Sequence, residues 1–402
     1  MGGPRFTGVR GPLEEYEVGF SSELAGQGYA KRTVRLQVRL MADVSLWLAC
    51  EGLGVGDLTL GVAERFMADR CRAGRRTHVT VRSVRPLLDY LDTLGVRGPE
   101  GPVVLGPVEE VLDRFGRYLA VERGLAAGTI AGYLAAVRPF VTGRWHGENV
   151  EFFDLRAAEV SRFVVAVCPG RPQGSAKLIV TGMRSLLGWL HLEGMMPIGL
   201  AAAVPAVASR RLKGLPEPLS ASQVRSLLAA CDRRSPVGRR DFAMIMLLWR
   251  LGLRAGEVAR LGLDDVDWRA GELTVTGKGP KTERLPLPTD VGEAVVGWLH
   301  RGRPPTAMGR TVFVRVVAPH GALSPTGVTQ AVFAAGRRAG LGTLHAHRLR
   351  HTAASDMLAA GASMSDIGQV LRHRRILTTA TYAKIDIAAL RSAAPAWPGN
   401  IR

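Results

Sequence analysis

Near its C-terminal end the chain reads Leu371-Arg372-His373-Arg374-Arg375-Ile376-Leu377-Thr378-Thr379-Ala380-Thr381-Tyr382. Tyr382 is the only tyrosine after position 133, and it lies nine residues beyond His373. Two related segments lie upstream, and they read His347-Arg348-Leu349-Arg350-His351 and Gly252-Leu253-Arg254-Ala255-Gly256-Glu257. Two arginines, two histidines and one lone tyrosine are therefore spread over about 130 residues.

These side chains suit a displacement at phosphorus, which needs a nucleophile, cations for the phosphate oxygens, a base, and an acid for the leaving oxygen. Arg254 and Arg350 suit the cationic role, because a guanidinium stays charged and matches phosphate geometry. Glu257 follows Arg254 by three residues near an expected helix start, where it can orient the arginine. His347 has the pKa range to accept a proton from Tyr382.

The acid that protonates the leaving oxygen is predicted to be a lysine. The chain holds 47 Arg but only 6 Lys, and two of these, Lys278 and Lys281, fall in the turn 277–284. A lysine can give up its proton to a leaving oxygen, whereas an arginine cannot do so usefully. Lys278 is preferred because it directly follows Gly277. Lys281 is then a solvated residue, although an exchange of the two roles stays open.

Other chemistry is less well supported. An isolated histidine–arginine pair or a lone tyrosine most often belongs to a core or a solvated face, and only the conjunction favours catalysis. Gly277-Lys278-Gly279 lacks the spacing of a P-loop. His345, His347 and His351 have no accompanying metal-binding motif, so we expect no metal and no other cofactor.

Residues 215–390 resemble the tyrosine recombinases, the family of phage integrases and bacterial chromosome-dimer resolvases. The family's first box is similar to 251–257, its second to 347–352, and its third to His373 with 378–382. The turn 277–284 resembles the hairpin that bears the family's catalytic lysine. Residues 105–205 resemble, more loosely, its helical core-binding domain. The implied fold is mainly α, with SAM-like helical modules, a small antiparallel β-sheet in the catalytic domain, and a C-shaped grip on DNA.

The resemblance implies a site-specific DNA recombinase or integrase that needs neither metal nor ATP. A tyrosine would attack the scissile phosphate, and a 3′-phosphotyrosyl link and a Holliday junction would follow. The implied partners are double-stranded DNA carrying specific sites and further copies of the chain, as a dimer on one site and a tetramer in the synapse. The implied catalytic residues are Arg254, Lys278, His347, Arg350, His373 and Tyr382, with Glu257 and His351 in support. Three alternatives stay open: a transposon-encoded tyrosine transposase, a type IB topoisomerase-like enzyme, and an inactive DNA-binding regulator.

The sequence departs from the family pattern at a few positions. Arg372 stands where the family usually has glycine, Arg374 and Arg375 follow the histidine, and Arg348 stands where aspartate is frequent. As a hypothesis, these arginines add phosphate contacts. The full set of candidate DNA-binding residues is Lys31, Arg32, Arg210, Arg211, Lys213, Lys281, Arg348, Arg372, Arg374 and Arg375.

The bulk composition fits a protein that meets a polyanion. The net charge is +18, and residues 215–402 carry 26 Lys and Arg against 14 Asp and Glu. GC-biased coding is the alternative source of the many arginines. The four cysteines are scattered and fit a reducing compartment. The N-terminus lacks an apolar signal region, and no 18-residue apolar run occurs, so we expect neither secretion nor a membrane span. Together with the family resemblance, this implies a cytoplasmic, DNA-associated bacterial protein.

A chain of 402 residues is too long for one core. Its N-terminal half shows a repeat of roughly 97 residues, as when 28–34 is compared with 124–130 and 87–91 with 186–190. The Gly- and Pro-rich segment 95–107 predicts a linker, and a second break follows Pro205. We therefore expect helical modules at 1–100 and 105–205 and a catalytic domain at 215–402, with a β-hairpin at 271–288. The first module could read additional DNA sites, extend the grip, or bind a neighbouring copy.

Overall fold

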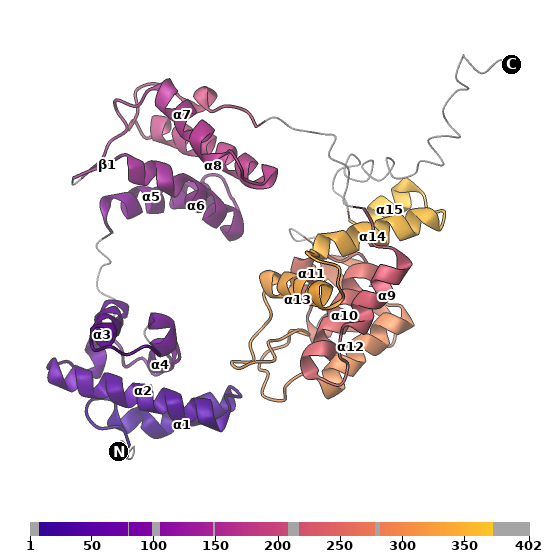
Figure 1. Ribbon diagram of the computed structural model, residues 1–402, viewed down its shortest axis with the longest axis horizontal. Helices are drawn as coiled ribbons and strands as arrows, with labels where there is room; N and C mark the ends of the chain where they lie inside the picture. Colours follow the sequence, from indigo (N-terminus) through magenta and orange to yellow (C-terminus); the bar gives the residue numbers. More distant parts are fainter. Residues whose placement is uncertain are drawn as a thin grey trace. The chain divides into compact units, whose positions relative to one another are not determined.

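The computed structural model describes residues 8–78, 80–98, 105–147, 149–207, 217–277 and 282–372. Helices dominate it and the strands are few and short, which confirms the mainly α fold with a small antiparallel sheet (Figure 1). Buried apolar side chains gather in three large clusters, within residues 9–91, 111–204 and 219–349. Backbone contacts, however, group the chain into two compact units, Glu100–Lys213 and Met1–Pro99 with Gly214–Arg402. The boundaries of the three predicted modules stay a prediction.

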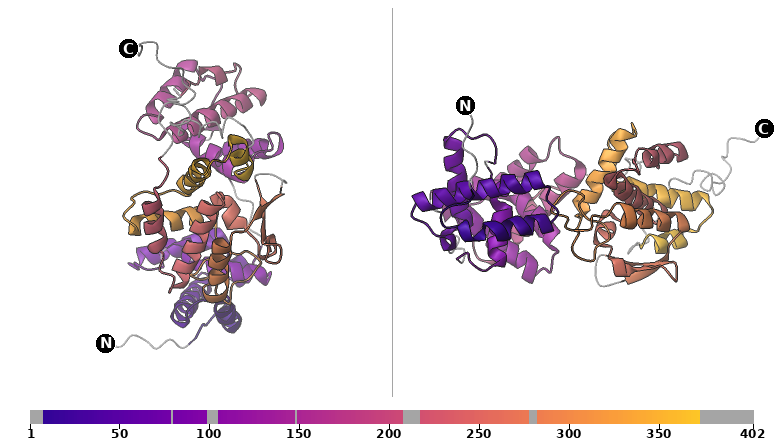
Figure 2. Two further views of the ribbon diagram at one scale, coloured as in Figure 1. Left: turned by 90° about the vertical axis from the view of Figure 1, so that its right-hand side faces the viewer. Right: turned by 90° about the horizontal axis from the view of Figure 1, so that it is seen from below.

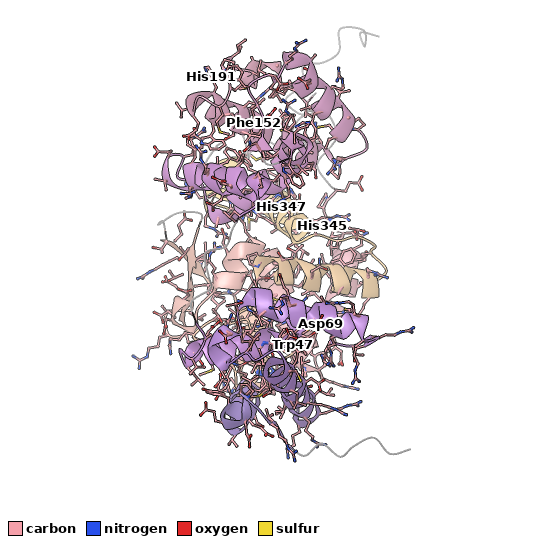
Figure 3. The ribbon with its side chains drawn as sticks, turned by 90° about the vertical axis from the view of Figure 1, so that its left-hand side faces the viewer. Trp47, Asp69, Phe152, His191, His345 and His347 are labelled. Carbon is pink, nitrogen blue, oxygen red and sulfur yellow. The ribbon has the colours of Figure 1, made fainter. Side chains whose placement is uncertain are left out.

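The first cluster is built by four helices. Along α2, the residues Val34, Val38, Met41 and Val44 are all buried, because steps of three and four residues bring them to one face. Trp47 on this helix donates a hydrogen bond of 3.0 Å to Asp69 (Figure 3). The helices are α1 (Glu17–Gly26), α2 (Lys31–Cys50), α3 (Leu60–Arg72) and α4 (Val81–Thr93).

The middle cluster repeats this order of four helices. Helix α6 begins 96 residues after α2, and α7 begins 97 residues after α3, which is the offset of the sequence repeat. A two-stranded hairpin of β1 (Trp145–His146) and β2 (Asn149–Val150) lies between α6 and α7. The helices are α5 (Pro107–Val121), α6 (Ala127–Gly143), α7 (Ala157–Val167) and α8 (Gln173–Leu192).

The region that holds the third cluster contains seven helices and a three-stranded sheet among its described residues. Ile367 of its last helix belongs to a small separate cluster with Ala354 and Leu371. Ser220 caps α9: its Oγ accepts from the Gln223 N–H at 3.2 Å, and Gln223 Oε1 accepts from the Ser220 N–H at 3.0 Å. The helices are α9 (Ala221–Ala229), α10 (Pro236–Arg250), α11 (Ala255–Arg260), α12 (Thr289–Arg301), α13 (Pro325–Arg338), α14 (Ala346–Ala359) and α15 (Met364–Val370).

The sheet has the order β3-β4-β5, formed by β3 (Val266–Asp267), β4 (Glu272–Thr276) and β5 (Thr282–Pro286). Strands β4 and β5 pair antiparallel from Glu272 with Pro286 to Thr276 with Thr282, which confirms the predicted hairpin. The sheet lies at the edge of the helices (Figure 2). No helix in the described part of the chain has the length and apolar character that crossing a membrane requires.

Two long-range contacts bring distant segments of this region together. Gly252 follows α10 with a φ of 57°, and a Cβ at this position would collide with the Leu371 side chain. Glycine is therefore required where the end of α15 approaches the first box. Thr352 on α14 donates to the Arg348 carbonyl and accepts from the Leu219 N–H, both at 3.0 Å. The bond from Leu219 to Thr352 holds the segment that leads into α9 against α14.

Candidate active site

Arg254 lies at the start of α11 and is held by Glu257. Its Nη1 donates to Glu257 Oε1 at 2.6 Å, and its backbone N–H donates to Glu257 Oε2 at 2.8 Å. The Arg254 side chain is 40% exposed, whereas that of Glu257 is 2% exposed. The acidic residue is therefore an internal support, and the guanidinium is accessible. This is the orienting contact that the three-residue spacing predicted.

Burial raises the pKa of the Glu257 carboxyl, but its partners outweigh that effect. The N–H of Arg254 and the guanidinium groups of Arg372 and Arg254 hold the pKa below its ordinary value. The carboxylate is therefore charged at neutral pH, and it balances part of the positive charge around it.

Arg350 lies in the first half of α14 and is 1% exposed. Its Nη1 donates to the carbonyl of Gly252, and its Nη2 donates to the carbonyl of Leu371. The guanidinium thus joins the first box to the end of α15. Because both carbonyls are fixed by the backbone, the arginine is rigidly placed.

His347 precedes Arg350 on α14 and is exposed. His351, one turn further along the helix, is buried. Figure 3 labels His347 with His345 at the start of the helix. The rings of His347 and His351 meet edge to face, with their centroids 4.4 Å apart.

The surroundings of both imidazoles favour their neutral forms. Partial withdrawal from water, followed by the charges of Arg350 and Arg254, lowers the pKa of His347 below its ordinary value. Burial, His347 and Arg350 lower the pKa of His351 to about 4. Neutral His347 can accept a proton at physiological pH, as a general base must.

Arg254, His347 and Arg350 line one cavity of about 250 Å³, together with Thr329, His345 and neighbouring apolar residues. The structure therefore brings together three of the six predicted catalytic residues, from two elements almost 100 residues apart. Two guanidinium groups and an imidazole around one small cavity can bind an anion the size of a phosphate and accept a proton beside it.

The other three predicted catalytic residues, Lys278, His373 and Tyr382, lie outside the described residues, and so do six of the candidate DNA-binding residues: Arg210, Arg211, Lys213, Lys281, Arg374 and Arg375. Lys31 and Arg32 are exposed at the start of α2. Arg348 is half-buried and donates to the Glu217 carbonyl at 2.9 Å.

Arg372 has a different environment from the one expected of a phosphate contact. Its side chain is 5% exposed, and its Nη2 donates to Glu257 Oε2 at 2.9 Å. The Arg372 carbonyl accepts from Arg254 Nη2 at 3.3 Å. This placement argues against a phosphate contact by Arg372, because the guanidinium already faces a buried carboxylate.

Sequence reasoning missed the backbone acceptors of the site. The carbonyls of Gly252, Leu371 and Arg372 hold the two arginines, and a carbonyl has no signature in a residue string. Only Gly252 carried a signal, since glycine marks a position of close approach.

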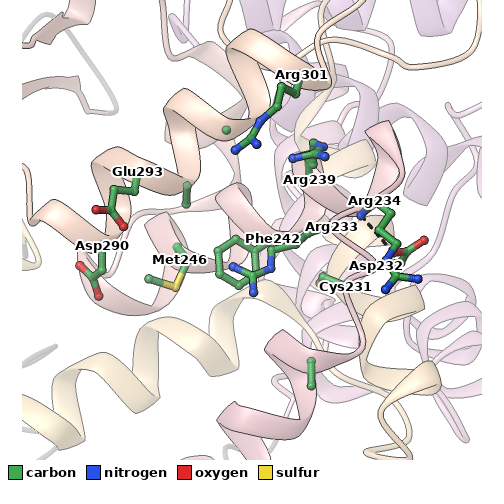
Figure 4. Close-up of a pocket in the computed structure, with 13 residues that line it drawn as sticks. Cys231, Asp232, Arg233, Arg234, Arg239, Phe242, Met246, Asp290, Glu293 and Arg301 are labelled. Carbon is green, nitrogen blue, oxygen red and sulfur yellow. Dashed lines mark hydrogen bonds between the residues drawn. The ribbon is translucent and has the colours of Figure 1, made fainter.

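A larger cavity of about 790 Å³ lies elsewhere in this region, between the loop after α9 and helices α10 and α12 (Figure 4). Arg233, Arg239 and Arg301 line it, and Arg233 lies over the ring of Phe242 with its guanidinium carbon 4.8 Å from the centroid. None of the predicted catalytic residues in the described part of the chain lines this cavity. Its size alone does not make it the reactive centre.

Residues 217–388 match the model of the phage integrase family. A protein of Sinorhizobium fredii, provisionally named integrase/recombinase y4rA, is 39% identical over 395 residues, which cover 97% of this chain and 96% of that protein. The tyrosine recombinase XerD of Mycobacterium tuberculosis is 33% identical over 301 residues, which cover 70% of this chain and 94% of XerD.

Solved structures share the fold. The XerH site-specific recombinase bound to a palindromic difH substrate has a TM-score of 0.55 at 17% identity, covering 83% of this chain and 94% of that one. A lambda integrase tetramer bound to a Holliday junction has a TM-score of 0.53 at 18% identity, covering 77% and 87%. The chain therefore belongs to the phage integrase family of tyrosine recombinases, and it is a DNA recombinase.

Proposed function

We propose that this recombinase cleaves DNA by attack of the Tyr382 phenol oxygen on the scissile phosphorus. A 3′-phosphotyrosyl bond forms, and the bond to the 5′ oxygen breaks. The 5′ hydroxyl of another strand then attacks the phosphotyrosine and releases Tyr382. The phosphotyrosine conserves the energy of the broken bond, so the cycle needs no ATP.

The single observation that carries this proposal is the shared cavity of Arg254, His347 and Arg350. The arginines would bind the non-bridging oxygens, where negative charge grows in the transition state. Neutral His347 would accept the phenol proton. His373 would add a donor to the phosphate, and Lys278 would protonate the departing 5′ oxygen.

On the same proposal, the chain acts on two duplexes as a tetramer through a Holliday junction, with a dimer on each site. The modules 1–100, 105–205 and 215–402 would divide the work, the middle one closing on the duplex opposite the catalytic domain. The similar solved structures are recombinases bound to DNA, including a dimer and a tetramer, which supports this assembly. The protein would work on DNA in the bacterial cytoplasm.

The first module is proposed to contact DNA through the exposed side of α2. Lys31, Arg32, Arg35 and Arg39 are exposed there, and none has a carboxylate partner among the described residues. Other arginines of the module do have carboxylate partners, as in the pairs Arg65–Glu51 and Arg85–Asp89. A row of unmatched cations favours phosphate as the partner.

A salt titration of DNA binding tests the role of α2. Changing its four basic residues to Gln should reduce the slope of log affinity against log salt by about 0.9 for each lost phosphate contact. Changing Arg65 and Arg85 to Gln is the matched control, because both are already paired. An unchanged slope, with loss of oligomers instead, would show that this face binds protein.

The chemistry is tested by covalent trapping. Duplexes with a randomised sequence around a nick are incubated with the protein, and protein-linked strands are recovered under denaturing conditions and sequenced. The nick lets the cleaved fragment diffuse away, so the phosphotyrosine accumulates. The recovered sequence defines a trapping duplex for all later experiments.

The Tyr382→Phe variant should bind the trapping duplex and form no covalent complex, whereas Tyr133→Phe should form it at the wild-type level. Undiminished trapping by Tyr382→Phe would overturn the assignment. Relaxation of supercoiled DNA without recombinant products would favour the topoisomerase alternative. Absence of trapping by the wild-type chain would favour the inactive regulator, and insertion without a fixed target would favour the transposase.

A further inference from the structure

Arg372 has an unusual backbone for an arginine. It follows α15 and Leu371, and its φ is 55°, in the left-handed region that favours glycine at the end of a helix. His78 is the other non-glycine residue with a positive φ in the described part of the chain. A side chain other than hydrogen is strained in this conformation, so its contacts have to offset that strain.

The contacts of Arg372 converge on the support of Arg254. Glu257 Oε2 receives both the Arg372 Nη2 and the backbone N–H of Arg254, while Oε1 receives the Arg254 Nη1. The Arg372 carbonyl in turn accepts from Arg254 Nη2. These four bonds close a ring of three residues, and they hold the carboxylate and the Arg254 guanidinium from both sides.

The charges explain why the ring is stable. A buried guanidinium is costly unless a carboxylate faces it, and Glu257 with a 2% exposed side chain is that carboxylate. Without Arg372, Oε2 would keep only the N–H of Arg254, and the Glu257 side chain would have one fewer restraint. Arg254 is the more exposed member of the ring, so its direction depends on the two buried ones.

We propose that Arg372 is a positioning residue for the cleavage reaction. It acts through Glu257 and through its own carbonyl to aim the Arg254 guanidinium at the phosphate, and it fixes Arg254 to the chain segment that precedes His373. This inference rests on the proposed function, in which Arg254 binds the scissile phosphate. It replaces the phosphate contact that the sequence suggested for Arg372.

The decisive variant is Arg372→Gly, because glycine suits the backbone and removes only the side chain. The rate of covalent complex formation on the trapping duplex should fall about tenfold to a hundredfold, since a small misplacement of a phosphate-binding group has an effect of this size. Affinity for the trapping duplex should stay within about threefold of wild type, because Arg372 does not face solvent. Arg372→Lys should recover part of the rate.

His78→Gly is the matched control, because it relieves a positive φ outside the site. It should cleave at the wild-type rate. A double-mutant cycle with Glu257→Gln then separates positioning from general packing. If Arg372 acts through Glu257, the double variant should lose little more rate than Glu257→Gln alone.

Two results would overturn the inference. One is a cleavage rate of Arg372→Gly within about twofold of wild type, and the other is a double variant whose loss of rate equals the product of the losses from Arg372→Gly and Glu257→Gln. Either result would leave the proposed function intact as long as the wild-type chain forms the covalent complex. Failure of the wild-type chain to form it would instead reject the proposed function. Thermal melting of every variant shows that each compared protein is folded.

Discussion

Replacing Glu257 with Ala removes the carboxylate that, among the described residues, faces both Arg254 and Arg372. The Arg372 guanidinium, 5% exposed, would be left in the protein without its counter-charge. Breaking a buried pair in this way costs about 3–5 kcal/mol of unfolding free energy. The Arg254 side chain adds little to this figure, because it is 40% exposed and water can solvate it. We therefore expect about 3–5 kcal/mol of local destabilisation.

Hydrogen exchange followed by mass spectrometry measures this loss where it occurs. Peptides from α10, α11 and α14 should lose protection, while peptides from α1 to α8 serve as an internal reference and should not change. Glu257→Gln should have a smaller effect, since its amide oxygen can still accept from the Arg254 N–H. A loss below about 1 kcal/mol in the alanine variant would refute the reasoning, because that is the size of an exposed pair.

Three further predictions concern protons. The pKa of the His351 imidazole is about 4 in the folded chain and about 6.5 in the unfolded chain. The unfolded chain therefore takes up this proton first, and the free energy of unfolding should fall by about 3 kcal/mol as the pH drops from about 6.5 to about 4. Melting curves at several pH values should show this loss, and a His351→Gln variant with the same loss would contradict it. His347 has a lowered pKa, so cleavage should stay constant from pH 8 to pH 6.5 and decline only at more acidic pH; a decline that begins above pH 6.5 would refute its role as the base. Lys278→Ala should slow cleavage of the trapping duplex, and a sulfur in place of the departing 5′ oxygen should restore the rate, because a thiolate leaves without an acid. If the sulfur instead restored cleavage by Lys281→Ala and had no effect on Lys278→Ala, Lys281 would be the acid and Lys278 the solvated residue.

The sequence alone located much of this region. Short β-branched runs around a Gly/Pro turn were sufficient for the β4–β5 hairpin, and the three-residue spacing was sufficient for the Arg254–Glu257 contact. Both depend on residues close together in the chain, where local geometry decides which groups meet. Steps of three and four residues likewise account for the buried face of α2.

Other features of the site depend on contacts that no local pattern encodes. Arg350 donates to the carbonyls of Gly252 and Leu371, which lie far from it in the chain. Arg372 looked like a surface arginine because the residues around it are basic, yet tertiary packing pairs it with Glu257. The burial of a charged side chain depends on what the fold places beside it, so the sequence could supply the residue but not its partner.

The central claim is that the Tyr382 oxygen carries the DNA during recombination. Digestion of the trapped complex with trypsin isolates this tyrosine, because cleavage after Arg375 and Lys384 gives a peptide of residues 376–384 in which Tyr382 is the only tyrosine. Mass spectrometry should find the DNA strand attached to that peptide through the Tyr382 side chain. Attachment to any other residue, or recombination without a protein-linked strand, would contradict the account.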